Sequence, residues 1–165
     1  MSIRFVQVKD KNQVSRLALL AKEIWEEYYP AIISQGQIAY MIDAFQSPAA
    51  IKNQMKEGMQ YYLVVNDGEE IGYLAYTVEQ GNKVFLSKIY IKRDFRSKGN
   101  GRKVFEFITQ QAINSWCKKI WLTVNKHNKA AIDIYLKTGF TITDSVKKGI
   151  GNGFYMDDYV MEYSV

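Results

Sequence analysis

The fold is decided by the stretch RSKGNGRK, which runs from Arg96 to Lys103. It follows a β-branched and aromatic run, Val84 to Ile91, and opens a segment with the apolar spacing of an amphipathic helix. Glycine lets the backbone approach a ligand closely, and the first amides of a helix have no intrahelical partner. Four of the eight side chains are basic. A strand, a glycine-rich turn and a helix in this order predict a phosphate site.

Two common phosphate motifs do not fit this turn. A dinucleotide loop, G-x-G-x-x-G, would need a third glycine where Val104 stands and an acid near Trp121, about twenty residues further on. A nucleoside triphosphate loop, G-x-x-x-x-G-K-[ST], occurs nowhere in the chain. The pattern that is present is R-x-x-G-x-G, formed by Arg96, Gly99 and Gly101. A solvated basic surface turn is the alternative interpretation.

A second pattern follows one helix and one strand later. After a predicted buried strand, 119–124, the chain reads N-x-x-A-x-x-x-Y-x-x-x-G-F. The asparagine can cap a helix that begins at Lys129, and the glycine can end that helix in the left-handed conformation. Lys137 would lie in its last turn, where cations are favoured. The positions of the pattern are Asn128, Ala131, Tyr135, Gly139 and Phe140.

The two patterns, in this order and separation, resemble the GNAT N-acetyltransferase superfamily. The resemblance implies an α/β fold with a mixed, largely antiparallel central sheet, one splayed parallel strand pair and flanking helices. It also implies acetyl-CoA as cosubstrate. The overall order of the chain, including Trp25-x-x-Tyr28-Tyr29 and the segment 153–158, is similar to bacterial polyamine or small-amine acetyltransferases.

The remaining segments suit this fold. Asp10 and Gln13 form a capping-box pattern before a helix whose apolar face includes Leu17, Ile24 and Tyr28. The sequence Asn66-Asp67-Gly68-Glu69 predicts a hairpin turn. The expected strands are 3–8, 61–65, 71–78, 84–91, 119–124, 140–146 and 154–163. The expected helices are one that follows the Asp10 cap and ends at Pro30, and those at 37–45, 49–57, 101–116 and 129–138.

Composition agrees with one domain over residues 1–165. The chain is 47% hydrophobic and 14% aromatic, which supplies a sizeable core. No apolar run approaches the ~20 residues that cross a bilayer, and the first residues do not read as a signal peptide. Cys117 is the single cysteine, which fits a reducing compartment and a packing role. We therefore expect a cytoplasmic protein without a membrane partner.

The net charge of +5 would attract a polyanion. Coenzyme A explains the positive charge beside the turn, and no helix-turn-helix, zinc or stacking motif supports nucleic acid as the partner. His127 is the sole histidine, and with one cysteine it offers no metal cluster, so we expect no metal. Aromatic residues on the final strands could support a homodimer.

The resemblance also assigns site residues. It places the pantetheine arm against the backbone of Ile89, Tyr90 and Ile91, where an amide could stabilise the developing oxyanion. It gives Tyr135 the role of protonating the departing thiolate, for which a neutral phenol is suited. A buried structural tyrosine is the alternative for that position. The remaining predicted cofactor residues are Arg96, Ser97, Lys98, Gly99, Asn100, Gly101, Arg102, Asn128, Ala131 and Lys137.

The sequence does not identify the general base. An alkyl ammonium has a pKa of ~10.4, so its neutral form is scarce at pH 7 and a base is expected. Many family members carry a glutamate on the strand before the turn, but 84–91 contains no carboxylate. A water chain would also serve, and for each carboxylate a solvated surface role is more common than catalysis. The candidates by residue type are Glu26, Glu27, Asp43, Glu79, Asp157 and Asp158.

The predicted acceptor site is aromatic. Trp25, Tyr28, Tyr29 and Tyr40 could receive a cationic amine through their ring faces, although core packing explains such residues equally well. We expect an N-acetyltransferase in which a primary amine, a polyamine or another small amine, attacks the thioester directly. A protein or peptide N-acetyltransferase and a noncatalytic acetyl-CoA-binding regulator are the alternatives, because fold does not fix substrate.

Overall fold

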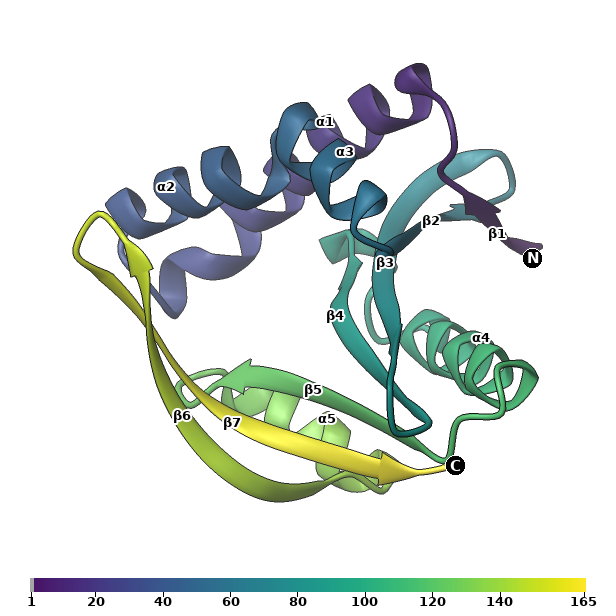
Figure 1. Ribbon diagram of the computed structural model, residues 1–165. Coiled ribbons are helices and arrows are strands. Elements are labelled where there is room, and N and C mark those ends of the chain that lie inside the picture. The colour runs from purple at the N-terminus through teal and green to yellow at the C-terminus, as the bar shows by residue number, and fades with distance from the viewer. Residues whose placement is uncertain (1) are drawn as a thin grey trace.

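A computed structural model describes residues 2–165. Its centre is a seven-stranded sheet in the order β1-β2-β3-β4-β5-β7-β6 (Figure 1). The strands are β1 (Ile3–Gln7), β2 (Gln60–Asn66), β3 (Glu69–Glu79), β4 (Lys83–Ile91), β5 (Lys119–Asn125), β6 (Thr141–Gly151) and β7 (Phe154–Ser164). The helices are α1 (Lys11–Tyr28), α2 (Gln35–Gln46), α3 (Pro48–Lys56), α4 (Asn100–Asn114) and α5 (Lys129–Thr138), with short 3-10 turns η1 (Tyr29–Ala31) and η2 (Arg93–Phe95).

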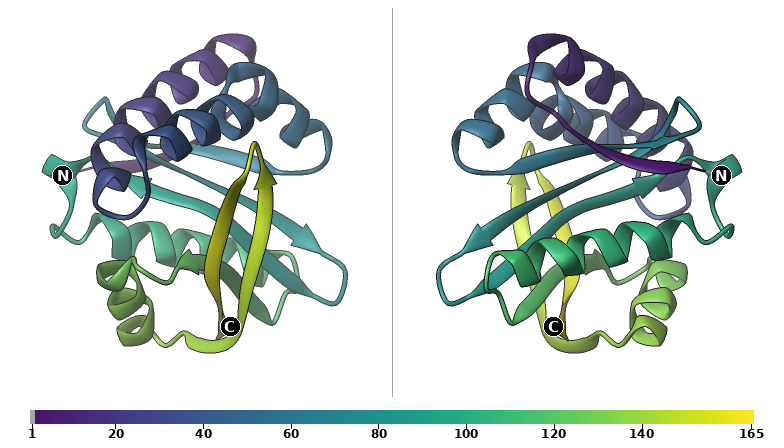
Figure 2. Two further views of the ribbon diagram at one scale, coloured as in Figure 1. Left: turned by 90° about the vertical axis from the view of Figure 1, so that its left-hand side faces the viewer. Right: turned by 90° about the vertical axis from the view of Figure 1, so that its right-hand side faces the viewer.

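The helices form two layers, one on each face of the sheet. Helices α1 to α3 cover one face and α4 and α5 the other (Figure 2). Each layer has its own buried cluster, which we call the α1-side core and the α4-side core. The α1-side core contains Leu17, Ile24 and Tyr73, and the α4-side core contains Val104 and Ile120. The expected α/β fold with flanking helices is thus confirmed.

Capping residues set the starts of the N-terminal helices. Asp10 accepts from the backbone N–H of Gln13, whose side chain accepts from the Asp10 N–H in return. This is the predicted capping box. The Ser34 and Ser47 hydroxyls cap α2 and α3 by accepting from the backbone N–H groups of Gln37 and Ala50, and the two short helices predicted around Pro48 are confirmed.

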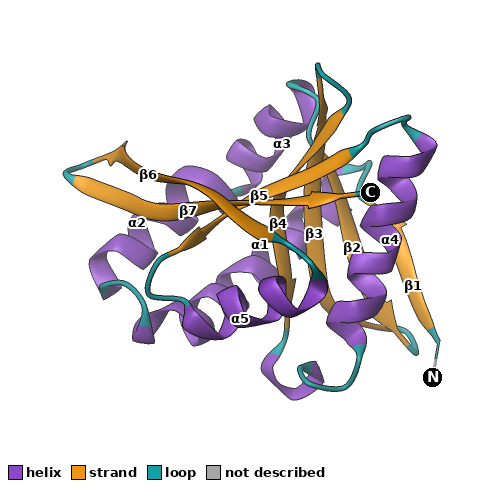
Figure 3. Cartoon of the chain, turned by 90° about the horizontal axis from the view of Figure 1, so that it is seen from below, coloured by secondary structure: helices purple, strands orange, loops and turns teal. Residues whose placement is uncertain are grey.

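One strand pair is parallel. Strand β4 pairs with β5 only over Lys83, Val84 and Phe85, and every other pairing in the sheet is antiparallel. Beyond Phe85 the two strands separate, and Figure 3 shows β5, β7 and β6 crossing the direction of β2 to β4. The splayed parallel pair expected from the sequence is present, and we call the region beyond Phe85 the split.

The last hairpin is longer than expected. The sequence predicted strands that end at 146 and begin again at 154, but the first strand continues to Gly151 and only Asn152 and Gly153 form the turn. Both have positive φ, 53° and 79°, which is the geometry of a tight two-residue hairpin. The hairpin reaches α2, where Tyr40 donates to the Ile150 carbonyl at 2.6 Å. None of the described helices is long and apolar enough to cross a membrane.

Candidate active site

The turn between β4 and α4 presents unused backbone amides. Gly99 has φ of 82° and precedes the first residue of α4, and Ser97 also has positive φ, 59°. The first amide of the helix to find an acceptor is that of Lys103, which donates to the Gly99 carbonyl at 3.2 Å. Within the described chain, no backbone N–H from Ser97 to Arg102 donates a hydrogen bond. Six consecutive free donors at a helix N-terminus suit an anion of more than one phosphate.

The residues of the turn fit a diphosphate. A Cβ placed on Gly99 or Gly101 would meet no other atom within 4 Å, so the surface above both is open. Lys98 and Arg102 are exposed beside it. Asn100 is 2% exposed and donates from Nδ2 to the Phe95 carbonyl at 2.9 Å, which fixes the shape of the loop. The turn predicted from the sequence therefore has the form that a phosphate site requires.

Arg96 is held by protein groups. Its Nε donates to the Ile91 carbonyl at 2.8 Å, and its guanidinium makes a bidentate pair with Glu27 at 2.6 and 3.2 Å. The same guanidinium lies 5.0 Å from the ring centre of Tyr28. Arg96 thus ties the turn to the end of α1 and to β4, and its predicted contact with the cofactor stays a prediction.

The backbone of β4 faces the split at alternate residues. The Lys92 N–H donates to the Ile71 carbonyl on β3 at 2.7 Å, and Gly72 stands opposite Ile91. Backbone groups alternate between the two edges of a strand, so Ile89 and Ile91 direct their amides toward β5. Tyr90 differs from the expectation, because its backbone pairs with Tyr73 of β3.

Helix α5 begins at the predicted cap. The Asn128 side chain is 9% exposed, and its Oδ1 accepts from the Tyr28 hydroxyl at 2.8 Å and from the Ala131 N–H at 3.4 Å. Asn128 thus joins the start of α5 to the end of α1, across the split. Ala131 is half-buried against the α4-side core, and Lys137 is exposed in the last turn of the helix.

Tyr135 approaches the split from α5. Its ring packs on Phe140, with centroids 5.4 Å apart. Burial raises the pKa of its phenol, with smaller contributions from Tyr28 and Tyr29, and the neighbouring Tyr135 in turn contributes to the raised pKa of Tyr90. Burial disfavours a charged phenolate, so these hydroxyls stay protonated near neutral pH.

The predicted acceptor residues divide into two groups. The Tyr29 and Tyr90 hydroxyls hydrogen-bond at 2.7 Å, so Tyr29 belongs to the split, as Tyr28 does. Trp25 is 3% exposed and packs behind Tyr29 and Tyr90, with centroids 5.4 and 5.5 Å apart, so it supports these rings from the α1-side core. Tyr40 lies at the tip of the last hairpin, against Phe154.

Most candidate bases already have partners. Glu27 pairs with Arg96, Asp157 with Lys126 at 3.0 Å, and Glu26 with Lys22 at 3.8 Å. Glu79 accepts from the indole N–H of Trp121 at 2.7 Å, and Asp43 lines a groove elsewhere. Asp158 is different, because it is 7% exposed and its Oδ1 has no hydrogen-bond partner in the described chain.

Lys88 was missed by the sequence analysis. It lies on β4 two residues before Tyr90, opposite Ala75 of the α1-side core, and its Nζ donates to the Ser87 hydroxyl at 2.8 Å. Burial lowers the pKa of its ammonium to about 8. The lysine occurs in a strand that reads as apolar, and its isolation there is the signal that could have found it.

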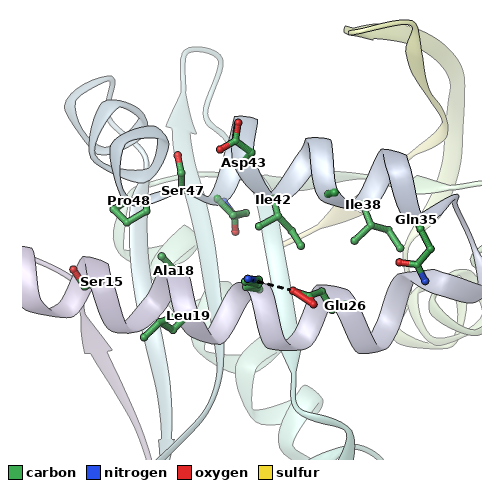
Figure 4. Close-up of a pocket in the computed structure, with 13 residues that line it drawn as sticks. Ser15, Ala18, Leu19, Glu26, Gln35, Ile38, Ile42, Asp43, Ser47 and Pro48 are labelled. Carbon is green, nitrogen blue, oxygen red and sulfur yellow. Dashed lines mark ion pairs between the residues drawn. The ribbon is translucent and has the colours of Figure 1, made fainter.

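A groove between α1 and α2 is separate from the split. It has a volume of about 710 Å³ and lies between α1 and α2, with Leu19, Ile38 and Ile42 among its lining residues (Figure 4). The Lys22 and Glu26 pair lies on its α1 side. None of its lining residues belongs to the turn or to α5. Among the described residues there is no group of three side chains that could hold a metal ion.

A splayed parallel strand pair, followed by a turn with six free backbone amides, is the arrangement expected of an acyltransferase that uses a nucleotide-containing cofactor. The family model described as "Acetyltransferase (GNAT) family" matches residues 19–140. The chain belongs to this family, and it is an acetyl-CoA-dependent N-acetyltransferase. The predicted cosubstrate, acetyl-CoA, is therefore confirmed.

Individual relatives agree with this assignment. The chain is 25% identical over 148 residues to an uncharacterized N-acetyltransferase of Lactobacillus delbrueckii subsp. lactis, covering 84% of each chain. It is 27% identical over 151 residues to the spermine/spermidine N(1)-acetyltransferase of Bacillus subtilis, covering 85% of this chain and 88% of the relative. The crystal structure of the PaiA N-acetyltransferase from Thermoplasma acidophilum, in complex with coenzyme A, has the same fold, with a TM-score of 0.83 at 22% identity over the whole of both chains.

Proposed function

We propose that this enzyme acetylates the primary amine of a small molecule, of the polyamine type, by direct attack of the amine on the thioester of acetyl-CoA. The proposal rests on three features of the site that follow one another in space: the turn, the free edge of β4 and Tyr135. Six free amides at the turn lead to the free edge of β4 at Ile89 and Ile91, and Tyr135 lies near enough to Tyr90 of the same strand to contribute to its raised pKa.

Each protein group then has one role. The amides from Ser97 to Arg102 hold the diphosphate of the cosubstrate, and Lys98 and Arg102 add positive charge. The Ile89 amide donates to the thioester oxygen as negative charge develops there, an interaction typically worth ~3 kcal/mol. Tyr135 donates its proton to the departing thiolate sulfur.

Two observations favour a small cationic acceptor. The rings of Tyr28, Tyr29 and Tyr90 gather on one side of the split, and aromatic faces attract ammonium groups. The last hairpin is bound to α2, where Gln37 donates to the Tyr155 carbonyl at 2.9 Å, and we infer that this contact narrows the access of an extended peptide. The name of the Bacillus subtilis relative, a spermine/spermidine acetyltransferase, points the same way.

The acceptor is tested by turnover. Spermidine, simple alkyl diamines and lysine-containing peptides are incubated with acetyl-CoA, and released thiol is followed. We expect turnover with the diamines and spermidine. Preference for peptides would support a protein acetyltransferase instead, and coenzyme A binding without any turnover would support the noncatalytic regulator.

The role of Tyr135 is tested with a matched pair of variants. Tyr135→Phe should lower kcat at least tenfold and leave the affinity for coenzyme A unchanged, because only the proton donor is lost. Tyr163→Phe is the control, since Tyr163 packs on Phe140 as Tyr135 does. Equal kcat values for the two variants would show that Tyr135 is a packing residue.

The turn is tested at Gly101. In Gly101→Val the added side chain meets open space within the protein but covers the free amides, so affinity for coenzyme A should fall at least tenfold while the melting temperature is kept. Gly36→Val is a matched control, because Gly36 occupies the second position of α2 as Gly101 does of α4. Unchanged affinity of Gly101→Val in calorimetry would refute the assignment of the turn.

A further inference from the structure

Asp158 lies where β5 ends and the split is open. It stands opposite Asn125, the last residue of β5, in the β5 and β7 pairing. The Lys126 N–H donates to the Asp157 carbonyl at 3.1 Å, which makes Asn125 and Asp158 a non-hydrogen-bonded pair. Side chains of such a pair lie on the same face and close together.

The Asp158 side chain lies on the same face of the sheet as the predicted acceptor residues. Side chains alternate along β7, and Tyr159, Met161 and Tyr163 pack in or against the α4-side core. Met156 packs against the α1-side core, so Asp158, two residues later, has the same orientation. Tyr29 and Tyr90 lie on this side as well.

The carboxylate lacks a donor that a ligand could supply. Asp158 is 7% exposed, and its Oδ1 is buried without a hydrogen-bond partner in the described chain. Buried carboxylate oxygens almost always have a donor, because leaving one unpaired is costly. An ammonium group carries three donors and the complementary charge.

The charged and titratable groups around Asp158 are few. Asp157 is its neighbour on β7, and Lys126, which pairs with Asp157, lies at the start of the turn before α5. Tyr29 faces it from η1, because the Asp158 carboxylate contributes, after burial and after Tyr28, to the raised pKa of the Tyr29 phenol. Burial, and then Asp157, raise the pKa of Asp158, and Lys126 opposes them.

We propose that Asp158 receives the ammonium group of the acceptor and takes its proton, so that it is the general base of this enzyme. The inference rests on the proposed function, since it requires an amine acceptor. It also explains why β4 can lack a carboxylate, because the base stands on the opposite wall of the split, on β7.

The proton transfers balance. The Asp158 carboxylate takes one proton from the ammonium, and the neutral amine forms the C–N bond at the thioester carbon. The C–S bond then breaks, Tyr135 gives its proton to the thiolate, and the phenol regains one from the acetylated nitrogen. Asp158 finally releases its proton to solvent. One ammonium and one thioester give one amide, one thiol and one proton.

Raising the pKa of Asp158 to about 6 suits this role. The group is still ionised at neutral pH, yet it is a stronger base than an exposed carboxylate. The activity should therefore rise as pH increases through about 6, because Asp158 ionises there, and we call this part of the pH–activity profile the limb near pH 6.

The test compares Asp158→Asn with Asp157→Asn, using spermidine and the diamines that the wild-type enzyme acetylates. Asp158→Asn should lower kcat/KM for the amine at least 100-fold near pH 7 and abolish the limb near pH 6, with affinity for coenzyme A kept within about twofold. The defect should shrink as pH approaches the pKa of the free amine, ~10.4, because the amine then arrives neutral. Asp157→Asn removes one contribution to the raised pKa of Asp158, so it should move the limb to lower pH but cause no large loss of kcat/KM near pH 7.

The outcomes separate the two proposals. Retention of kcat/KM and of the limb near pH 6 in Asp158→Asn would overturn the assignment of Asp158, and so would a defect that is the same at every pH. Absence of turnover with every amine in the wild-type enzyme would instead overturn the proposed function. Binding of coenzyme A by calorimetry shows that each variant is folded.

Discussion

Replacing Asp158 with asparagine should stabilise the protein near neutral pH while it removes activity. Folding raises the pKa of Asp158 from its ordinary value of 3.8 to about 6, so the folded state disfavours the charged form. At about 1.36 kcal/mol per pKa unit, this costs the folded protein about 3 kcal/mol once both states are ionised, above pH 6. An asparagine of similar size carries no charge and does not bear that cost.

The sign and the pH window follow from proton counting. Between pH 3.8 and 6 the folded protein holds more protons than the unfolded chain, so the stability of the wild type falls as pH rises through this range. The advantage of Asp158→Asn should therefore grow with pH and level off above pH 6. About half of it, about 1.5 kcal/mol, should develop between about pH 5 and about pH 8.

Urea unfolding of both proteins at these two pH values measures the effect. With a slope of about 2 kcal/mol per molar urea, the difference between the two unfolding midpoints should change by about 0.7 M from the lower to the higher pH. Comparing the two pH values removes any constant effect of the amide itself. A difference that is independent of pH, or that shrinks above pH 6, would show that burial does not raise the pKa of Asp158 and would remove the physical basis of its assignment as the base.

Three other changes test the frame of the site. Gly72→Ala should lower the free energy of unfolding by about 1–3 kcal/mol and weaken coenzyme A binding, since its Cβ would clash with the Tyr90 carbonyl of β4; intact affinity measured by calorimetry would contradict this. Glu27→Gln should weaken coenzyme A binding about two- to fivefold if Arg96 acts by anchoring the turn, whereas tighter binding would show that Arg96 contacts phosphate directly. Lys88→Met should raise the free energy of unfolding by about 1–2 kcal/mol near pH 7, because folding lowers the pKa of this half-buried ammonium to about 8. The gain in stability should decline between pH 8 and 10.5, where the lysine of the folded protein is already neutral. Urea unfolding near pH 7 and near pH 10 measures it, and an equal gain at both pH values would contradict the reasoning.

Local patterns predicted the parts of the site that local structure forms. The turn at Gly99 and the cap at Asn128 depend on a few neighbouring residues, and both stand where the spacing placed them. The parallel pair followed from one crossover helix, because such a connection returns the chain to the same sheet. Its divergence beyond Phe85 came from the family resemblance and is confirmed by the register.

Long-range contacts decided the rest. The partner of Arg96 is Glu27, 69 positions away in sequence, and no spacing rule connects the two. Asp158 differs from Asp157 only in the face of β7 on which it lies, and that face depends on the register of β5, β7 and β6. Six carboxylates were equal by residue type, and burial distinguished one of them. Tyr90 was predicted to offer its backbone, but the alternation along β4 turns its amide toward β3.

One physical effect, removal from water, prepares both ends of the proposed proton transfer. Burial raises the pKa of Asp158, which makes the carboxylate a stronger base, and raises the pKa of Tyr135, which keeps the phenol protonated. A thiol has an ordinary pKa of ~8.5 and a phenol one of ~10, so proton transfer from Tyr135 to the thiolate is by itself unfavourable. It becomes favourable only when the phenol regains a proton from the nitrogen. Its donation must therefore be coupled to loss of the second amine proton. A thiolate is also a tolerable leaving group without protonation, so Tyr135→Phe should retain measurable turnover, whereas Asp158→Asn should retain it only where the solution itself supplies neutral amine.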